Sequence, residues 1–213
     1  SYFGYDPDGL EHSVYDLFLH QGQVPEGLAA QLLLPTSHEK IALLPATTAL
    51  ATLERQAPGQ SGLGLVIARS LAQLWQDYDY AIIDSPPILG VLMVNALAAS
   101  QQLIIPVQTE HLALKGLEHM VHTLRMINRS RPQELPFCIV PTLFDRRTQA
   151  SMSTLRVLRD VYPDTLWQGF IPVDTRLRDA SRAGQTPSQF DEKTRGVIAY
   201  RALLKHVLTR QLA

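Results

Sequence analysis

The sequence holds a single cysteine and no stretch suited to cross a membrane. Cys138 alone excludes an intramolecular disulfide, a CxxC redox motif and any metal or iron–sulfur site built from several cysteines. It fits a reducing, cytosolic setting. The longest charge-free segment, Ser85–Thr109, contains prolines, glutamines and an asparagine that a lipid-exposed helix would not combine. Ser1–His12 has three acidic residues and no lysine or arginine, so the sequence predicts neither a membrane span nor an export signal.

Charged residues are scarce and unevenly distributed. Of 213 residues, 18% are charged and 46% are hydrophobic, which is typical of a folded soluble chain long enough for one α/β domain. The formal charge is −1, but residues 1–114 hold three basic and eleven acidic side chains, whereas residues 115–213 hold sixteen and nine. This asymmetry favours contact between the second half and a polyanion, unless the excess charge only forms a solvated face.

Short apolar runs alternate with amphipathic segments along the chain. The runs predicted as strands are Lys40–Pro45, Tyr78–Asp84, Gln102–Val107, Phe137–Pro141 and Thr165–Pro172. The segments predicted as helices are Ser61–Gln76, Val91–Ala99, Lys115–Asn128, Ser151–Tyr162 and Gly196–Leu212. This alternation favours an α/β fold with a mostly parallel sheet and helices on both faces, and residues 1–213 are interpreted as a single domain.

Two of these segments carry sharper expectations. Tyr78–Asp84 runs without polar alternation, so it is predicted to be a buried parallel strand covered on both faces. The apolar side of the Ser61–Gln76 helix is predicted from its helical spacing. The residues on that side are Leu65, Ala68, Leu71, Ala72 and Trp75.

Polar residues follow three of the predicted strands, at the edge of the sheet where open α/β folds bind their ligands. Asp84 follows the first of them, and a carboxylate there suits a magnesium ion held through a water. The other interpretation of Asp84 is a cap on the following turn. Arg147 and Arg176 lie beyond the two later strands, where an arginine either binds phosphate as a two-pronged donor or remains a solvated surface group.

Together these strand exits resemble the ParA/MinD family of deviant Walker-type P-loop ATPases, on its partition and cargo-positioning branch. The similar motifs occur in the family's order along nearly the whole chain: Tyr78–Pro87, Asn95–Ala99, Ile105–Gln108, Asp145–Thr148, Ile171–Ala180, Gly184 and Arg195–Tyr200. The opening segments Tyr5–Leu10 and Ser13–Leu17 resemble the region that follows the family's second strand. The resemblance implies a P-loop NTPase-like fold and hydrolysis of ATP with Mg²⁺.

The resemblance also assigns roles to single residues. Asp84 matches the catalytic Walker B aspartate, which lies near the magnesium ion and its water. Arg147 and Arg176 match arginines that hold DNA phosphates without sequence preference. The two loops that flank adenine in the family match Thr142, Pro172 and Val173.

The partners and location implied by the resemblance follow from the same branch of the family. They are an ATP-dependent homodimer, non-specific DNA, and a ParB-like or other protein that stimulates hydrolysis. The cargo would be a plasmid, a chromosome or a chemosensory cluster. The protein would be cytoplasmic, on the nucleoid or in a polar cluster.

The family's glycine-rich turn with lysines, which cradles the phosphates, is absent from this sequence. The four lysines lie outside glycine-rich turns, and Pro58–Gly64 has glycines but no lysine. We therefore expect the first strand, first helix and second strand of the fold to lie upstream of Ser1, and this chain alone to bind ATP weakly and to be inactive. Loss of a central strand would leave an open sheet edge, which pairing or oligomerisation relieves.

The sequence also leaves other functions open. One is a non-catalytic module that keeps the fold for dimerisation and docking. A second is an amidase or ligase of the cobyrinate type, which would need a further domain for which little chain length remains. Gly196–Leu212 would lie on a membrane in the MinD branch, but its position favours a core-packing helix. His119 and His122 lack the carboxylate or cysteine partners of a metal site.

Overall fold

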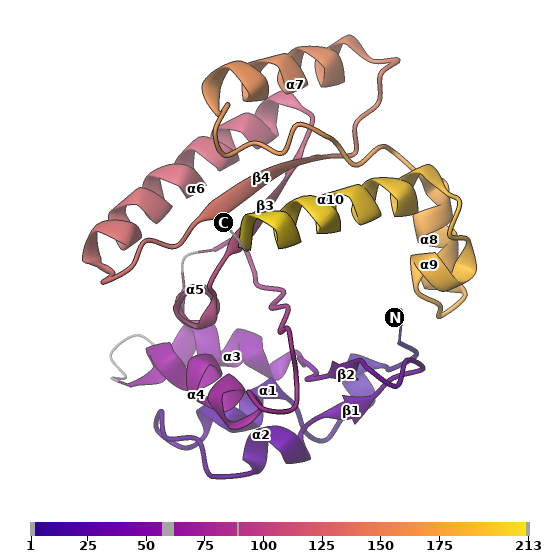
Figure 1. The fold of residues 1–213 in the computed structure, drawn as a ribbon. Coiled ribbons are helices and arrows are strands. Elements are labelled where there is room, and N and C mark those ends of the chain that lie inside the picture. Colours follow the sequence, from indigo (N-terminus) through magenta and orange to yellow (C-terminus); the bar gives the residue numbers. More distant parts are fainter. Residues whose placement is uncertain (1–2, 57–61, 89, 212–213) are drawn as a thin grey trace. The chain divides into compact units, whose positions relative to one another are not determined.

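The computed structural model describes residues 3–56, 62–88 and 90–211, and these divide into two units (Figure 1). The N-terminal unit is Tyr5–Gln101. The C-terminal unit consists of the described residues from Gln102 onward, together with Phe3 and Gly4. Each unit has a hydrophobic core of its own. The acidic first half of the sequence corresponds closely to the N-terminal unit, and the basic second half corresponds closely to the C-terminal unit.

The N-terminal unit is mostly helical. Its elements are η1 (Pro7–Gly9), α1 (Val14–Phe18), α2 (Leu28–Gln31), β1 (Leu34–Pro35), β2 (Ala42–Leu43), α3 (Ala49–Gln56), η2 (Leu63–Leu65), α4 (Val66–Gln73) and α5 (Val91–Ala99). The two short strands pair antiparallel, with Leu34 opposite Leu43. Apolar side chains from these elements pack into one core, comprising Leu17, Phe18, Ala29, Leu32, Leu53, Leu63, Val66 and Leu74.

A buried amide fixes α5 to the turn that precedes α4. The side chain of Asn95 is fully buried and donates hydrogen bonds to the carbonyls of Leu63 at 2.6 Å and Val91 at 2.8 Å. Its own carbonyl oxygen accepts from the backbone N–H of Ile67 at 3.1 Å. Because a buried amide must find partners for both its donor and its acceptor, this asparagine specifies how α4 and α5 pack.

The C-terminal unit contains the parallel sheet. Its elements are β3 (Leu103–Gln108), α6 (His111–Ser130), β4 (Phe137–Thr142), α7 (Gln149–Val161), α8 (Thr175–Arg182), α9 (Pro187–Phe190) and α10 (Arg195–Gln211). The strands β3 and β4 pair in parallel from Leu103 opposite Phe137 to Gln108 opposite Thr142. Both strands therefore end at the same edge of the sheet, and the loops that follow them emerge together.

Helices cover both faces of this sheet, as the sequence predicts. Figure 1 shows α6 and α7 on one side of the strands and α10 on the other. The helix α10 packs Leu203 against Cys138 and Val140 of β4, with Trp167 in the same core. Its position confirms that the closing helix packs on the core. No helix in the described ranges combines the length and apolarity needed to span a membrane.

The predictions based on strong periodicity are confirmed. The helix Val91–Ala99 has the predicted bounds, and α6 includes the predicted helix Lys115–Asn128 and buries Leu117, Val121 and Leu124 at helical spacing. The strands β3 and β4 match their predicted segments to within one residue at each end. These segments have hydrophobic patterns that leave one secondary structure favoured over the others.

The predicted buried strand Tyr78–Asp84 is wrong for this structure. The segment forms no strand, and Ile82 is 98% exposed while Tyr80 is 66% exposed. A strand is stabilised by the hydrogen bonds of a neighbouring strand, and no described segment supplies such a ladder here. The apolar composition of this segment is therefore not sufficient to bury it.

The predicted apolar side of the helix Ser61–Gln76 is also wrong. Ser61 lies outside the described residues, and the α-helix begins only at Val66. A left-handed glycine, Gly62 with φ +89°, and the 3-10 turn η2 precede it and rotate its buried side. Val66 and Ser70 are buried as a result, whereas Leu65 and Trp75 are 48% and 69% exposed.

The predicted strand Thr165–Pro172 pairs with the β4 side of the sheet only at separate points. Leu166 lies opposite Ile139, and Pro172 lies opposite Phe144, both in parallel. Between them the chain bends at Gly169, where a β-carbon would lie 2.4 Å from the ring of Trp167. The close approach of this ring requires a glycine, and the bend interrupts the strand.

Candidate functional site

Two loops that are far apart in sequence lie side by side at the carboxyl edge of the sheet. The backbone N–H of Phe144 donates to the carbonyl of Ile171 at 3.0 Å, and the N–H of Val173 donates back to Phe144 at 3.1 Å. Thr142 ends β4 immediately before this contact, and Pro172 lies within it. The structure thus brings together the three residues that the family resemblance assigns to adenine-flanking loops.

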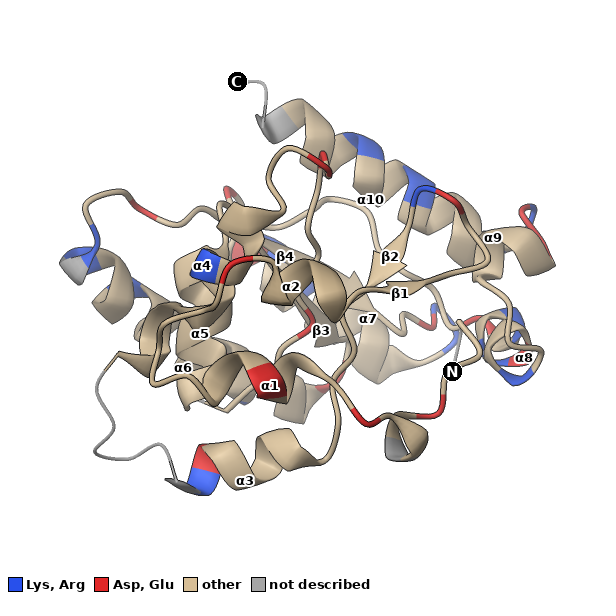
Figure 2. Cartoon of the chain, turned by 90° about the horizontal axis from the view of Figure 1, so that it is seen from below, with Lys and Arg blue, Asp and Glu red and all other residues tan. Residues whose placement is uncertain are grey.

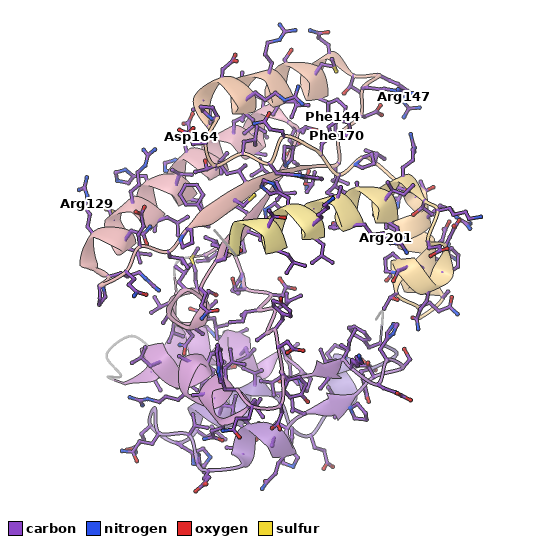
Figure 3. All side chains as sticks on the ribbon, in the orientation of Figure 1. Arg129, Phe144, Arg147, Asp164, Phe170 and Arg201 are labelled. Carbon is purple, nitrogen blue, oxygen red and sulfur yellow. The ribbon has the colours of Figure 1, made fainter. Side chains whose placement is uncertain are left out.

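Aromatic packing supports the same pair of loops. The rings of Phe144 and Phe170 lie with their centroids 4.2 Å apart and tilted by 41° (Figure 3). Phe144 is buried, while Val173 is 37% exposed. The first loop is therefore anchored by a buried ring, whereas Val173 of the second loop is accessible to solvent.

Buried hydroxyl groups hold the first loop in place. The hydroxyls of Thr109 and Ser151 hydrogen-bond to each other, and that of Ser151 accepts from the backbone N–H of Asp145 at 3.1 Å. Leu143 adopts a left-handed φ of +51°, an uncommon conformation for a residue with a β-carbon. The sequence prediction missed Thr109 and Ser151, whose only local signal is a hydroxyl beside a strand end and beside a helix start.

Arg147 lies at the outer edge of this loop and is paired with Asp145 (Figure 3). The guanidinium Nε donates to Oδ1 at 2.9 Å, and Nη2 donates to Oδ2 at 2.7 Å. The side chain of Arg147 is 82% exposed, while that of Asp145 is 22% exposed. This is a two-pronged arginine–carboxylate contact, the geometry with which arginine also binds phosphate.

The contact shifts the titration of both partners. Hydrogen bonding from the Arg147 guanidinium lowers the pKa of Asp145 from its ordinary value of 3.8 to about 2. The same contact raises the pKa of Arg147. Because the folded-state pKa of Asp145 is depressed, the pair's contribution to stability is complete above about pH 4 and is lost as the pH falls through about 2.

An NMR titration of the Asp145 carboxyl carbon checks this assignment. We expect a midpoint near pH 2 in the wild type and a higher one after Arg147→Ala, because the hydrogen-bonded cation is then gone. The midpoint should stay below 3.8, since the backbone N–H of residue 147 still donates to the carboxylate. Arg146→Ala removes a neighbouring cation that does not contribute to the shift and is expected to leave the midpoint near 2. A wild-type midpoint near 3.8 would show that the pair does not persist in solution.

Arg176 lies on α8 and has carboxylate partners as well. Its Nη2 lies 3.3 Å from Oδ2 of Asp191, and its Nη1 lies 4.0 Å from Oδ2 of Asp179. The guanidinium also sits over the ring of Phe190, 4.8 Å from the ring centroid. Figure 2 shows that both basic and acidic residues occur along α8.

The start of α8 is tied to the start of α10. Asp174 caps α8 by accepting the backbone N–H of Arg176 at 3.0 Å, and its other oxygen accepts from Gly196 at 2.8 Å. The segment after Val173 therefore leads directly into a fixed helix. This capping fixes the position of Arg176 in the first turn of α8.

Asp84 belongs to the N-terminal unit, whereas the other five predicted site residues belong to the C-terminal unit. It is exposed and follows the unpaired segment that ends at Ile83. A hollow of about 400 Å³ in the same unit is lined by Glu11, Ser13 and Asp16, among others. Its two carboxylates would repel a triphosphate, so we do not assign the nucleotide to it.

The described residues contain no group of three or more histidine, cysteine, aspartate or glutamate side chains placed to hold a metal ion. Cys138 lies in β4 and is fully buried in the core.

In the C-terminal unit, the loops at Thr142 and Pro172 lie side by side. In the N-terminal unit, Asp84 offers an exposed carboxylate oxygen of the kind that magnesium accepts. The sequence contains no lysine in a glycine-rich turn, so these residues do not include a phosphate cradle.

Comparison with known proteins identifies the class. A family model described as an AAA domain matches residues 1–137. The chain is 31% identical over 205 residues to the sporulation initiation inhibitor protein Soj of Bacillus subtilis, spanning 96% of this chain and 79% of that protein. It is 29% identical to the chromosome partitioning protein ParA of Myxococcus xanthus, spanning 97% and 72% of the two chains.

Solved structures agree on the fold. A cobyrinic acid a,c-diamide synthase from Mycobacterium smegmatis, bound to an ATP analogue and magnesium, has a TM-score of 0.79 and 32% identity over 99% of this chain and 77% of that one. A complex of McdA from Cyanothece with ATP has a TM-score of 0.75 at 17% identity, covers 89% and 73% of the two chains, and supports the fold alone.

The protein is thus a P-loop NTPase of the α/β class. Within that class, the chain belongs to the ParA/MinD family of P-loop ATPases. By this family resemblance it is an ATPase, and ATP and Mg²⁺ are the nucleotide and metal that accompany the fold.

Proposed function

We propose that the protein is an ATPase that partitions or positions cargo through ATP-dependent dimerisation and non-specific binding to DNA. The observation that carries this proposal is the contact between the loops at Phe144 and Pro172. It places the candidate nucleotide residues Thr142, Pro172 and Val173 in one neighbourhood. In both loops a candidate DNA-binding arginine follows within five residues.

The charge of the C-terminal unit supports DNA as the partner. Residues 115–213 hold sixteen basic and nine acidic side chains, and binding to phosphates needs such an excess but no base-specific contacts. A dimer would present two such units, so its affinity for a polyanion would exceed that of a monomer. ATP would control DNA binding by controlling dimerisation.

Asp84 is proposed as the carboxylate that orients the magnesium ion through a water. Magnesium keeps several of its waters in proteins and accepts carboxylate oxygens, so an exposed aspartate can serve without a closed metal cage. The exposure of Asp84 is consistent with this role. When bound, the metal would neutralise negative charge on the transferring phosphoryl group.

The remaining features of the proposal come from the relatives. Their names as chromosome partitioning proteins suggest a segregating chromosome or plasmid as cargo. A ParB-like or other partner would stimulate hydrolysis. We propose that the protein acts in the cytoplasm, on the nucleoid or at a polar cluster.

A single substitution at the loop rim tests the nucleotide assignment. Val173→Asp in the full-length protein is expected to weaken binding of a fluorescent ATP analogue with Mg²⁺ by roughly 10-fold, because a carboxylate at the rim repels the nucleotide and is costly to desolvate. Equilibrium fluorescence titration measures the change.

The matched control is Val157→Asp, the same exchange at a 42% exposed valine on α7 of the same unit. It is expected to leave nucleotide affinity within about 2-fold, because surface substitutions away from a site usually have small effects. Equal weakening in the two variants, or no weakening in either, would refute the placement of the base at this rim.

A second candidate function is ATP-dependent amidation, favoured by the similarity to a protein named cobyrinic acid a,c-diamide synthase. Glutamine-dependent ATP turnover by the full-length protein would support it. A stimulation by DNA that does not require glutamine would support the partitioning ATPase. A folded protein without any ATP turnover would instead indicate the non-catalytic dimerisation module.

A further inference from the structure

Both candidate DNA-binding arginines are already engaged with carboxylates of their own unit. Arg147 contacts Asp145, and Arg176 contacts Asp191 with Asp179 farther away. A phosphodiester would use the same guanidinium N–H groups, because carboxylate and phosphate oxygens bind arginine in the same two-pronged geometry. A bound phosphate and the internal carboxylate therefore compete for each arginine.

Asp145 is held in position to compete. Its backbone N–H donates to the buried hydroxyl of Ser151 at 3.1 Å, and its Oδ1 accepts the backbone N–H of Arg147 at 3.0 Å. The carboxylate is thus fixed by the loop, whereas the Arg147 side chain is 82% exposed and is accessible to a phosphate from solvent. Since the pKa of Asp145 is about 2, it remains charged at any physiological pH.

Asp191 has a similar arrangement. Its Oδ1 accepts the backbone N–H of Lys193 at 3.1 Å, which leaves Oδ2 to face Nη2 of Arg176 at 3.3 Å. The ring of Phe190 lies against the guanidinium, so this arginine has one face and one edge occupied.

We propose that Asp145 and Asp191 set the affinity of the protein for DNA by competing with phosphates for Arg147 and Arg176; this rests on the proposed DNA binding. The carboxylates act as internal phosphate mimics. A single phosphate cannot displace both, whereas a polyanion presents many phosphates at once and benefits from each exchange. The pairs thereby weaken binding to isolated anions and keep the interaction with DNA readily reversible.

The proposal makes a prediction about salt that differs from simple charge removal. The ions released on binding are the cations condensed on the DNA. When an arginine leaves its carboxylate for a DNA phosphate, the carboxylate left behind attracts a cation, so the net release of ions is smaller than for an unpaired arginine. Asp145→Asn frees Arg147 and should tighten DNA binding about 3- to 5-fold while steepening the slope of log K against log salt by about 1. Asp191→Asn should act likewise through Arg176, and asparagine keeps a side-chain oxygen that can accept the local backbone N–H.

The matched control is Asp160→Asn on α7, an exposed aspartate of the same unit with no contact to either arginine. It changes the net charge equally. It is expected to tighten binding less than 2-fold, because exposed charges beyond a Debye length are screened. A difference between Asp160→Asn and the two test variants therefore reports pairing and not overall charge.

The experiment is fluorescence anisotropy of a labelled mixed-sequence DNA duplex with the full-length protein, a non-hydrolysable ATP analogue and Mg²⁺, at several salt concentrations. Each test variant is measured alone and combined with alanine at its arginine, and thermal melting verifies that every variant is folded. The expected result is tighter binding in Asp145→Asn that disappears in the Arg147→Ala background, with the same relation between Asp191 and Arg176. Tightening no greater than in Asp160→Asn, or tightening that persists without the arginine, overturns the proposal.

The outcomes separate this inference from the proposed function. If the arginine variants lose DNA affinity but the aspartate variants gain none, DNA binding stands and the competition does not. If the wild type binds weakly and Asp145→Asn binds well, the competition is supported directly. If no variant binds DNA, both proposals are overturned.

Discussion

Asp84→Asn is expected to reduce the ATP turnover of the full-length protein by at least about 100-fold, the effect of removing a group that acts on developing charge in the transition state. Asparagine preserves the size of the side chain but removes the charge that orients the magnesium ion. Because Asp84 is exposed and lies outside any strand, the fold should be unaffected. Phosphate release with saturating ATP and Mg²⁺ measures the change.

Asp79→Asn is the control for this variant. Asp79 is an exposed aspartate five residues earlier in the same segment and is not placed in the site. It is expected to retain turnover within about 2-fold, as for most exposed positions. If Asp84→Asn retains wild-type turnover, the aspartate only caps its turn, which was the other interpretation of the sequence.

The double variant Arg147→Ala/Arg176→Ala is expected to lower DNA affinity by roughly 10- to 100-fold. It should flatten the salt slope by less than about 2, because each carboxylate-paired arginine contributes less than the full unit of an unpaired phosphate contact. The loss should be large because each deletion also leaves a carboxylate, Asp145 or Asp191, facing the DNA. Anisotropy of a labelled duplex at several salt concentrations measures both quantities.

Arg125→Ala/Arg156→Ala removes the same charge from exposed positions on α6 and α7 and serves as the control. It should weaken binding by less than the test pair and leave the salt slope nearly unchanged. Nucleotide binding should persist in both double variants. A loss of ATP binding in the test pair would contradict the separation of the DNA contacts from the nucleotide loops.

Periodic segments were predictable because their pattern is local. Val91–Ala99 and the apolar side of α6 follow from the spacing of hydrophobic residues, and they occur in the structure as predicted. The same holds for β3 and β4, whose apolar runs are bounded by polar turns. The α/β class follows from the alternation of these elements.

Tyr78–Asp84 shows where a local pattern is not sufficient. Its residues favour a strand, yet a strand depends on a partner whose position is not encoded within the segment. The helix after Gly62 gives a second example. There one left-handed residue and a 3-10 turn change which side chains are buried, although the apolar composition is unchanged.

For the candidate site, the sequence by itself determined the chemistry available at each strand exit: an aspartate at Asp84 and arginines at Arg147 and Arg176. Only the tertiary structure decided what these arginines meet. Arg176 reaches a carboxylate fifteen residues away because α8 and α9 turn the chain back on itself. The bidentate pairing of Arg147 likewise depends on a loop that buried hydroxyls hold in place. Residue types and spacing fix which charges exist, but the distance between two charges is set by the path of the chain, and electrostatic interaction depends on that distance.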